Sequence, residues 1–107
     1  MPAFFLCPYL RAEAELTDER EAHIADRHST FVPYLHYIAP TLAEPDLIRG
    51  NLAAPNARRF YRSYDDVERG KYVVVVVVSD VDLPRHWIVT AHLANRASGG
   101  ILEWARS

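Results

Sequence analysis

The sequence predicts an α+β fold, with N-terminal helices packed on one face of a four- to five-stranded antiparallel sheet. Three observations support this prediction. Apolar residues recur at helical spacing before residue 45, β-branched and aromatic residues fill four short stretches after residue 57, and short polar segments separate those stretches. Short turns between consecutive strands are typical of an antiparallel meander, and helices that precede the strands are typical of α+β architecture.

The first half of the chain predicts one short strand and two helices. Residues 9–16, "YLRAEAEL", alternate between apolar and charged side chains, which indicates a strand with one solvent-exposed face. Thr17 can cap a helix that ends near His28, with acidic residues in its first turn. A second helix is expected over residues 31–42, with a buried face made of Phe31, Leu35, Ile38 and Leu42. The segment "EPDLIRGNL" then predicts a turn and a short strand.

The second half predicts four strands, "ARRFYRSY", "KYVVVVVVSD", "RHWIVTAHLA" and "ILEWARS", joined by the turns "DDVERG", "DVDLP" and "NRASGG". The run of valines indicates a strand that is covered on both faces for much of its length. In the third strand we expect one set of alternating residues to face the core: Trp87, Val89, Ala91 and Leu93. The other set should then face away from the core: His86, Ile88, Thr90 and His92.

Length and composition limit the class of protein. A chain of 107 residues fits a single domain over residues 1–107, and its net charge of −2 provides no global basic field for nucleic acid. Cys7 is the only cysteine, so no intramolecular disulfide can form, and we expect an inert thiol in a cytoplasmic protein. The longest valine run is far below the ~20 residues of a membrane helix, so we expect no membrane partner.

Two strands carry candidate substrate-binding residues on the expected open face. Thr90 and His92 lie two residues apart, which makes them candidates for holding a substrate oxygen. In "ARRFYRSY", Arg59, Arg62 and Tyr61 place basic side chains among aromatic ones, a pattern that suits phosphate contacts and base stacking. The alternative is a solvated sheet edge whose arginines deter aggregation. Lys71, at the turn into the valine strand, is a further candidate for phosphate contact, although a plain surface lysine is the simpler interpretation.

The segment "HIADRHST" places His23, Arg27 and His28 within two turns of chain. It is either a solvated helix end or the basic half of a site for phosphate chemistry. A metal site is not expected, because the histidines do not form HExxH and a single cysteine excludes thiolate zinc sites. His23 and His28 are also five residues apart, about 140° around a helix. We therefore expect neither a metal nor another cofactor.

Five segments together resemble a known family. "HIADRH", "APTLAEPDLI", "RFYRS", "GKYVVVVVVSD" and "WIVTAHLANRASGGILEW" occur in this order over about residues 20–104. They resemble the phage-associated nuclease domains of the barnase–EndoU–colicin–RelE group. The resemblance implies an α+β domain with helices on one face of an antiparallel sheet and a metal-independent RNA-cleaving site on the other. It implies that His28, His23, Thr90 and a basic residue of "RFYRS" form that site. His92 departs from the pattern, because a tyrosine is expected after "TA".

The leading hypothesis is therefore a metal-independent endoribonuclease, toxin-like or of prophage origin. Cleavage through the 2′-hydroxyl needs a base, an acid and cations around the phosphorus, which histidine and arginine supply. His28, at the negative end of its helix, suits the acid or a phosphate ligand, and His23 suits the base. The expected partners are tRNA, mRNA or other single-stranded RNA, with an inhibitor or immunity protein as a candidate. The alternatives are a non-catalytic RNA- or protein-binding module on the same fold and an unrelated small-molecule enzyme.

Overall fold

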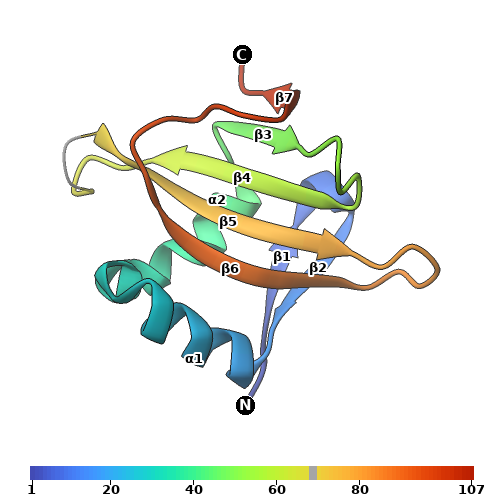
Figure 1. Ribbon diagram of the computed structural model, residues 1–107, viewed down its shortest axis with the longest axis horizontal. Coiled ribbons are helices and arrows are strands. Elements are labelled where there is room, and N and C mark those ends of the chain that lie inside the picture. The colour runs from blue at the N-terminus through green and yellow to red at the C-terminus, as the bar shows by residue number, and fades with distance from the viewer. Residues whose placement is uncertain (68–69) are drawn as a thin grey trace.

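The computed structural model describes residues 1–67 and 70–107 of the chain. In this part, two α-helices and two 3-10 helices accompany the strands: η1 (Pro8–Leu10), α1 (Asp18–Arg27), η2 (Ser29–Tyr37) and α2 (Ile38–Ala43). The strands are β1 (Ala3–Cys7), β2 (Ala12–Leu16), β3 (Leu47–Gly50), β4 (Ala57–Ser63), β5 (Tyr72–Ser79), β6 (His86–Ala94) and β7 (Ile101–Ala105). These seven strands form one sheet in the order β1-β2-β6-β5-β4-β3-β7 (Figure 1).

The α+β class is confirmed, but the predicted size and purely antiparallel pairing of the sheet are wrong. β4, β5 and β6 form three strands of the expected antiparallel meander, but the fourth expected strand, β7, does not pair with β6. β3, expected as a separate short strand, pairs antiparallel with β4. A segment of the predicted turn "DDVERG" lies outside the described residues. The apolar segment "AFFLC" forms an additional strand, β1, whose hairpin with β2 extends the sheet. β2 then pairs with β6 in parallel through Glu15 and Trp87, which makes the sheet mixed.

The second predicted helix is divided into two different helices. η2 occupies residues 29–37, and α2 begins only at Ile38. Pro33 lies inside η2, where its missing N–H and its ring disfavour a continuous α-helix. The predicted buried face nevertheless holds, since Phe31, Ile38 and Leu42 are buried and Leu35 packs against the core. Neither α-helix of the described part has the length and apolar content that a membrane span requires.

The core lies between the helices and one face of the sheet. α2 lies behind β4 and β5, whereas α1 lies beside β6 (Figure 1). On β5, the side chains of Val73, Val75 and Val77 belong to this core. Val74, on the other face of β5, is also fully buried, which confirms the prediction of a strand covered on both sides over much of its length.

A β-bulge in β6 overturns the predicted alternation of that strand. Thr90 pairs with Val76 of β5 and Ile88 pairs with Val77, so that Val89 is the extra residue of the bulge. Ile88 consequently points into the core and is fully buried, while Trp87, which pairs with Val78, lies on the opposite face. One additional residue therefore reverses the facing of every side chain on one side of the bulge.

The connection between β6 and β7 crosses the sheet rather than forming a hairpin. β7 pairs with β3 at one edge of the sheet, so residues 95–100 run from β6, an interior strand, to that edge (Figure 1). The crossing requires glycine at Gly100, which has φ +63°, and a Cβ built there would lie 1.9 Å from the carbonyl oxygen of Gly50. This connection covers part of the face that the helices leave free.

Candidate functional site

The face of the sheet opposite the helices is called the open face here; its central side chains are those of Arg59, Tyr61, Val74, Val76, Thr90 and His92. Residues directly opposite each other on paired strands share a face. Val76 pairs with both Arg59 and Thr90, so these two side chains lie on one rung of the ladder. His92 lies on the next rung of this face, opposite Val74. The predicted facing of Thr90 and His92 away from the core is thus observed.

Three histidines meet where the end of α1 reaches β6. The ring of His28 lies 5.3 Å from the ring of His92 and 6.4 Å from the ring of His23, measured between centroids. α1 holds His28 in place, because the backbone N–H of His28 donates to the carbonyl of Ile24, and the Ile24 side chain is fully buried. Residues from a helix and from a strand more than 60 positions later therefore form one cluster.

Electrostatics distinguish His92 within this cluster. Burial lowers the pKa of His92, and the nearby charges of His28 and Arg59 lower it further. The imidazole of His92 is therefore held in its neutral form near pH 7, which is the form that accepts a proton.

Two polar atoms of the open face are buried without a protein partner. Thr90 Oγ1 and His92 Nδ1 make no hydrogen bond within the described part of the chain. An unsatisfied buried polar atom costs about 1–3 kcal/mol, so such atoms are uncommon outside functional sites. Thr90 Oγ1 is covered by its neighbours, and a substrate oxygen can reach it only after an adjacent side chain moves.

Arg59 contributes a half-buried guanidinium beneath the β6–β7 connection. Its Nη2 lies 3.3 Å from the position that a Cβ of Gly99 would occupy, and no ion pair joins it to a carboxylate of the described residues. Arg49 of β3 pairs directly with Arg59 and was not identified from the sequence. Its Nε donates to the Ala97 carbonyl at 2.7 Å and thereby holds the connection. Two cations on one rung repel each other unless an anion lies between them.

A comparison with models of protein families identifies the family of the chain. The family model described as phage-Barnase-EndoU-ColicinE5/D-RelE like nuclease2 matches residues 11–102. The chain belongs to this phage nuclease family. The resemblance inferred from the sequence motifs is thereby confirmed, and the match contains every residue of the histidine cluster and of the open face. Neither the curated proteins nor the solved structures provided a match to the chain.

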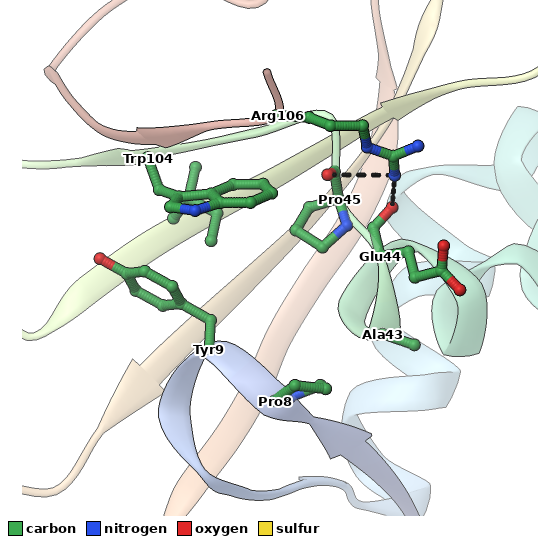
Figure 2. A pocket seen from close by; sticks show the side chains of 8 residues that line it. Pro8, Tyr9, Ala43, Glu44, Pro45, Trp104 and Arg106 are labelled. Atoms are coloured by element: carbon green, nitrogen blue, oxygen red, sulfur yellow. Dashed lines mark hydrogen bonds between the residues drawn. The ribbon is translucent and has the colours of Figure 1, made fainter.

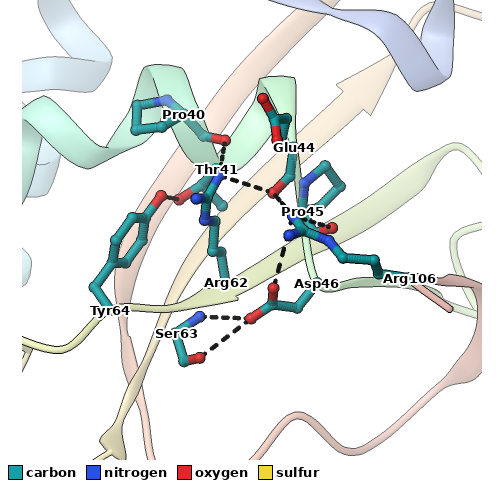
Figure 3. A network of polar contacts seen from close by, with 9 residues as sticks. All are labelled: Pro40, Thr41, Glu44, Pro45, Asp46, Arg62, Ser63, Tyr64 and Arg106. Carbon is teal, nitrogen blue, oxygen red and sulfur yellow. Dashed lines mark hydrogen bonds and ion pairs between the residues drawn. The ribbon is translucent and has the colours of Figure 1, made fainter.

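The structure does not bring Arg62 to the histidine cluster. Arg62 lies on the helix-covered face, where its Nη1 donates to the carbonyls of Pro40 and Glu44 at 3.3 and 3.1 Å (Figure 3). Its guanidinium also lies 5.1 Å from the ring centre of Tyr64. Arg62 therefore attaches α2 to β4. The alternation of β4 separates Arg59 from Arg62, and sequence alone could not decide which arginine faces the helices.

The other predicted residues have different surroundings. Tyr61 lies on the open face but is buried, and its hydroxyl donates to the carbonyl of Ser98 at 3.5 Å. Arg27 is exposed and lies 3.9 Å from the Asp26 carboxylate. Lys71 is half-buried immediately before β5, three residues from Val74. No hydrogen bond or ion pair within the described chain joins these three side chains to the histidines.

A cavity of about 510 Å³ lies away from this cluster (Figure 2). It opens between η1, the end of α2 and β7, with Tyr9 and Trp104 facing each other across it. None of the histidines, Thr90 or Arg59 lines this cavity, so we do not assign the candidate site to it. Within residues 1–67 and 70–107, no group of three or more His, Cys, Asp and Glu side chains is arranged to hold a metal ion.

Proposed function

We propose that this phage nuclease cleaves RNA by attack of the 2′-hydroxyl on the adjacent phosphorus, without a metal ion. The observation that carries this proposal is the contact between the rings of His28 and His92, whose centroids are 5.3 Å apart, near Arg59, which has no ion pair within the described residues. Two imidazoles at this spacing can reach atoms of one phosphodiester. Their different surroundings favour a division into one proton acceptor and one proton donor.

In the proposed mechanism His92 is the base and His28 is the acid. Neutral His92 accepts the proton of the 2′-hydroxyl while the 2′-oxygen forms a bond to phosphorus. The bond from phosphorus to the 5′-oxygen then breaks, and His28 donates a proton to that oxygen. The products are a 2′,3′-cyclic phosphate and a free 5′-hydroxyl. This assignment differs from the expectation that His23 is the base, because the lowered pKa belongs to His92.

Arg59 and Thr90 serve the phosphate in this mechanism. The guanidinium of Arg59 stabilises the charge that develops on the non-bridging oxygens, because a cation in a partly dry site stabilises such charge strongly. Thr90 supplies a hydroxyl donor on the same rung. His23, with its ring 6.4 Å from that of His28, restricts the orientation of the acid.

The test is cleavage of RNA by the purified protein in excess EDTA. We expect fragments that end in 2′,3′-cyclic phosphate from RNA and no cleavage of the matching DNA, which lacks the 2′-hydroxyl. Loss of cleavage in EDTA, or products that end in 3′-hydroxyl, would contradict the mechanism. Intact RNA across structured and unstructured substrates would contradict the proposed activity itself.

A non-catalytic module that binds RNA or protein is the second candidate. The net charge of −2 favours it, because a chain without a basic field has no long-range attraction for a polyanion. In that case His28→Ala should leave binding to RNA or to the partner unchanged, and no substrate should be cleaved.

A further inference from the structure

Trp87 lies on the open face, near the proposed catalytic cluster. The bulge at Val89 places it there, opposite Val78 of β5, and its side chain is half-exposed. Large aromatic side chains usually turn toward the core, where their burial is most favourable. A tryptophan on the face that carries the chemistry is therefore available to a ligand.

Arg85 covers the ring of Trp87. Its guanidinium carbon lies 4.8 Å from the ring centre, and its Nη2 lies 3.2 Å from the Glu15 carboxylate. Glu15 is also the strand partner of Trp87 in the parallel pair between β2 and β6. The carboxylate thus holds a planar cation against an aromatic ring. Aromatic rings and guanidinium planes are the two surfaces on which unpaired RNA bases stack.

The distance from this pair to the catalytic cluster suits a chain of nucleotides. Thr90 pairs with Val76 and Trp87 pairs with Val78, so the two side chains lie two residues apart along β5, about 7 Å. Val76 and Val78 are half-exposed on the same face and form an apolar surface between Thr90 and Trp87. A strand that places one phosphate at Arg59 and Thr90 therefore brings a neighbouring nucleotide to Trp87.

We propose that Trp87 and Arg85 form a binding site for an unpaired nucleobase next to the cleaved phosphodiester. This inference rests on the proposed function, because it identifies the open face as the path of an RNA strand. The base stacks on the guanidinium of Arg85 or directly on Trp87 after Arg85 swings aside. Because every base has a π-face, the site selects single-stranded RNA rather than one particular base.

Fluorescence provides a direct test, because the chain contains only two tryptophans. In the full-length Trp104→Phe variant, emission comes from Trp87 alone. The probe is a short oligonucleotide with 2′-O-methyl sugars, which cannot be cleaved through the 2′-hydroxyl. We expect it to quench Trp87, and an abasic oligonucleotide of equal charge to quench much less. Equal quenching by both probes would overturn the proposal, since the signal would then report phosphate and not a base.

Variants test the same site through kinetics. We expect Trp87→Ala to raise KM for RNA by about 5- to 150-fold, the scale of one lost base stack, with kcat little changed. Trp87→Phe should retain most of the affinity, because the aromatic face remains. Arg85→Ala should weaken binding less than Trp87→Ala, and it serves as the second variant if Trp87→Ala does not fold. An unchanged KM in Trp87→Ala or, where that variant does not fold, in Arg85→Ala would overturn the proposal.

The outcomes separate this inference from the proposed function. Quenching by the base-containing probe without cleavage of any RNA would leave the nucleobase site in place and remove the catalytic proposal. RNA cleavage without quenching, and with an unchanged KM in the Trp87→Ala or Arg85→Ala variant, would retain the catalytic proposal and remove the nucleobase site.

Discussion

The two faces of the sheet use the same residue types in different ways. On the helix-covered face, Arg62 and Arg106 both donate to the Glu44 carbonyl, and Arg106 also lies 3.8 Å from the Asp46 carboxylate (Figure 3). On the open face, Arg59 has no carboxylate partner in the described chain, and Thr90 Oγ1 is buried without a hydrogen bond. Paired arginines stabilise the fold, whereas unpaired ones remain available for a ligand.

The physical reason for this difference lies in the end of α2. The last carbonyls of a helix have no partner within the helix, and cationic side chains satisfy them well. Glu44 presents such a carbonyl to Arg62, and the Pro40 carbonyl, which already accepts from the Glu44 N–H, accepts from Arg62 as well. Among the described residues no helix end lies above β4 on the open face, and the cation of Arg59 lies instead beneath the glycines of the crossing connection.

The largest expected effect is on catalysis by the histidine cluster. We expect His92→Ala and His28→Ala each to lower the rate of RNA cleavage by about 10²-fold or more, the scale of a lost acid or base. His36→Ala is the matched control, because His36 is exposed and its ring contacts that of Tyr37 at a tilt, outside the histidine cluster. The rate of RNA cleavage by each variant measures this effect, and circular dichroism checks that each variant is folded. Wild-type activity in a folded His28→Ala protein would remove His28 from the mechanism.

The crossing connection can be tested with two glycines. Gly70→Ala should cost about 1–2 kcal/mol of unfolding free energy, since Gly70 has φ +68° but nothing within 4 Å of the new Cβ. Gly100 has a similar φ, but the Cβ of Gly100→Ala would also collide with the Gly50 carbonyl. The loss of unfolding free energy should therefore be about 1–3 kcal/mol larger than that of Gly70→Ala. Urea unfolding measures both. Equal losses would mean that the connection yields to the added methyl group without strain.

Replacing Arg59 and Arg62 separately by alanine tests the contrast between the two faces of the sheet. Arg59→Ala should lower kcat/KM by about 10²-fold with little change in stability, because it removes a charge-stabilising donor. Arg62→Ala should lower the unfolding free energy by about 1–3 kcal/mol, because it removes two hydrogen bonds that join β4 to the end of α2. The turnover per folded molecule should be unchanged. Kinetics and urea unfolding on both variants measure this, and the reverse pattern would contradict the assignment of the faces.

The smallest expected effect is the dependence of stability on pH. The pKa of His92 is lowered in the folded protein, so below about pH 6.5 the unfolded chain binds a proton that the folded chain resists. The unfolding free energy should therefore fall as pH decreases through this value. His92→Asn should make this dependence of the unfolding free energy on pH less steep.

His86 provides the comparison for that experiment. Burial and the Arg58 charge lower its pKa as well, but His86 lies outside the histidine cluster and is hydrogen-bonded to Ser79. His86→Asn should also reduce the slope, and RNA cleavage should be unchanged in that variant. Thermal unfolding between pH 5 and 8 measures both effects. A slope that neither substitution alters would contradict the role given to these histidines.

Several features of the fold were readable from local sequence patterns. Thr17 predicted the start of α1, and its Oγ1 accepts from the Arg20 N–H at 3.2 Å. The valine run predicted β5, and alternation placed Thr90 and His92 on the face away from the core. These features follow from propensities and periodicities that act within a few residues.

The facing of Trp87 and the parallel pairing of β2 with β6 could not be predicted in this way. A bulge adds one residue without a strong sequence signal, and it reverses the alternation on one side of Val89. Strand order depends on which edge of the sheet the β1–β2 hairpin meets after the core has formed. Both features arise from competition among packing arrangements of the whole chain.

The sequence by itself determined helix α1 and strands β2 to β7, the family to which the chain belongs and the residue types of its candidate site. Only the tertiary structure decided that His28 meets His92, that Arg59 shares a rung with Thr90 and that Arg62 does not. The reason is that local patterns specify how each segment is built and which of its faces is apolar. Contacts between residues of different helices and strands depend instead on how these elements pack to bury their apolar faces together.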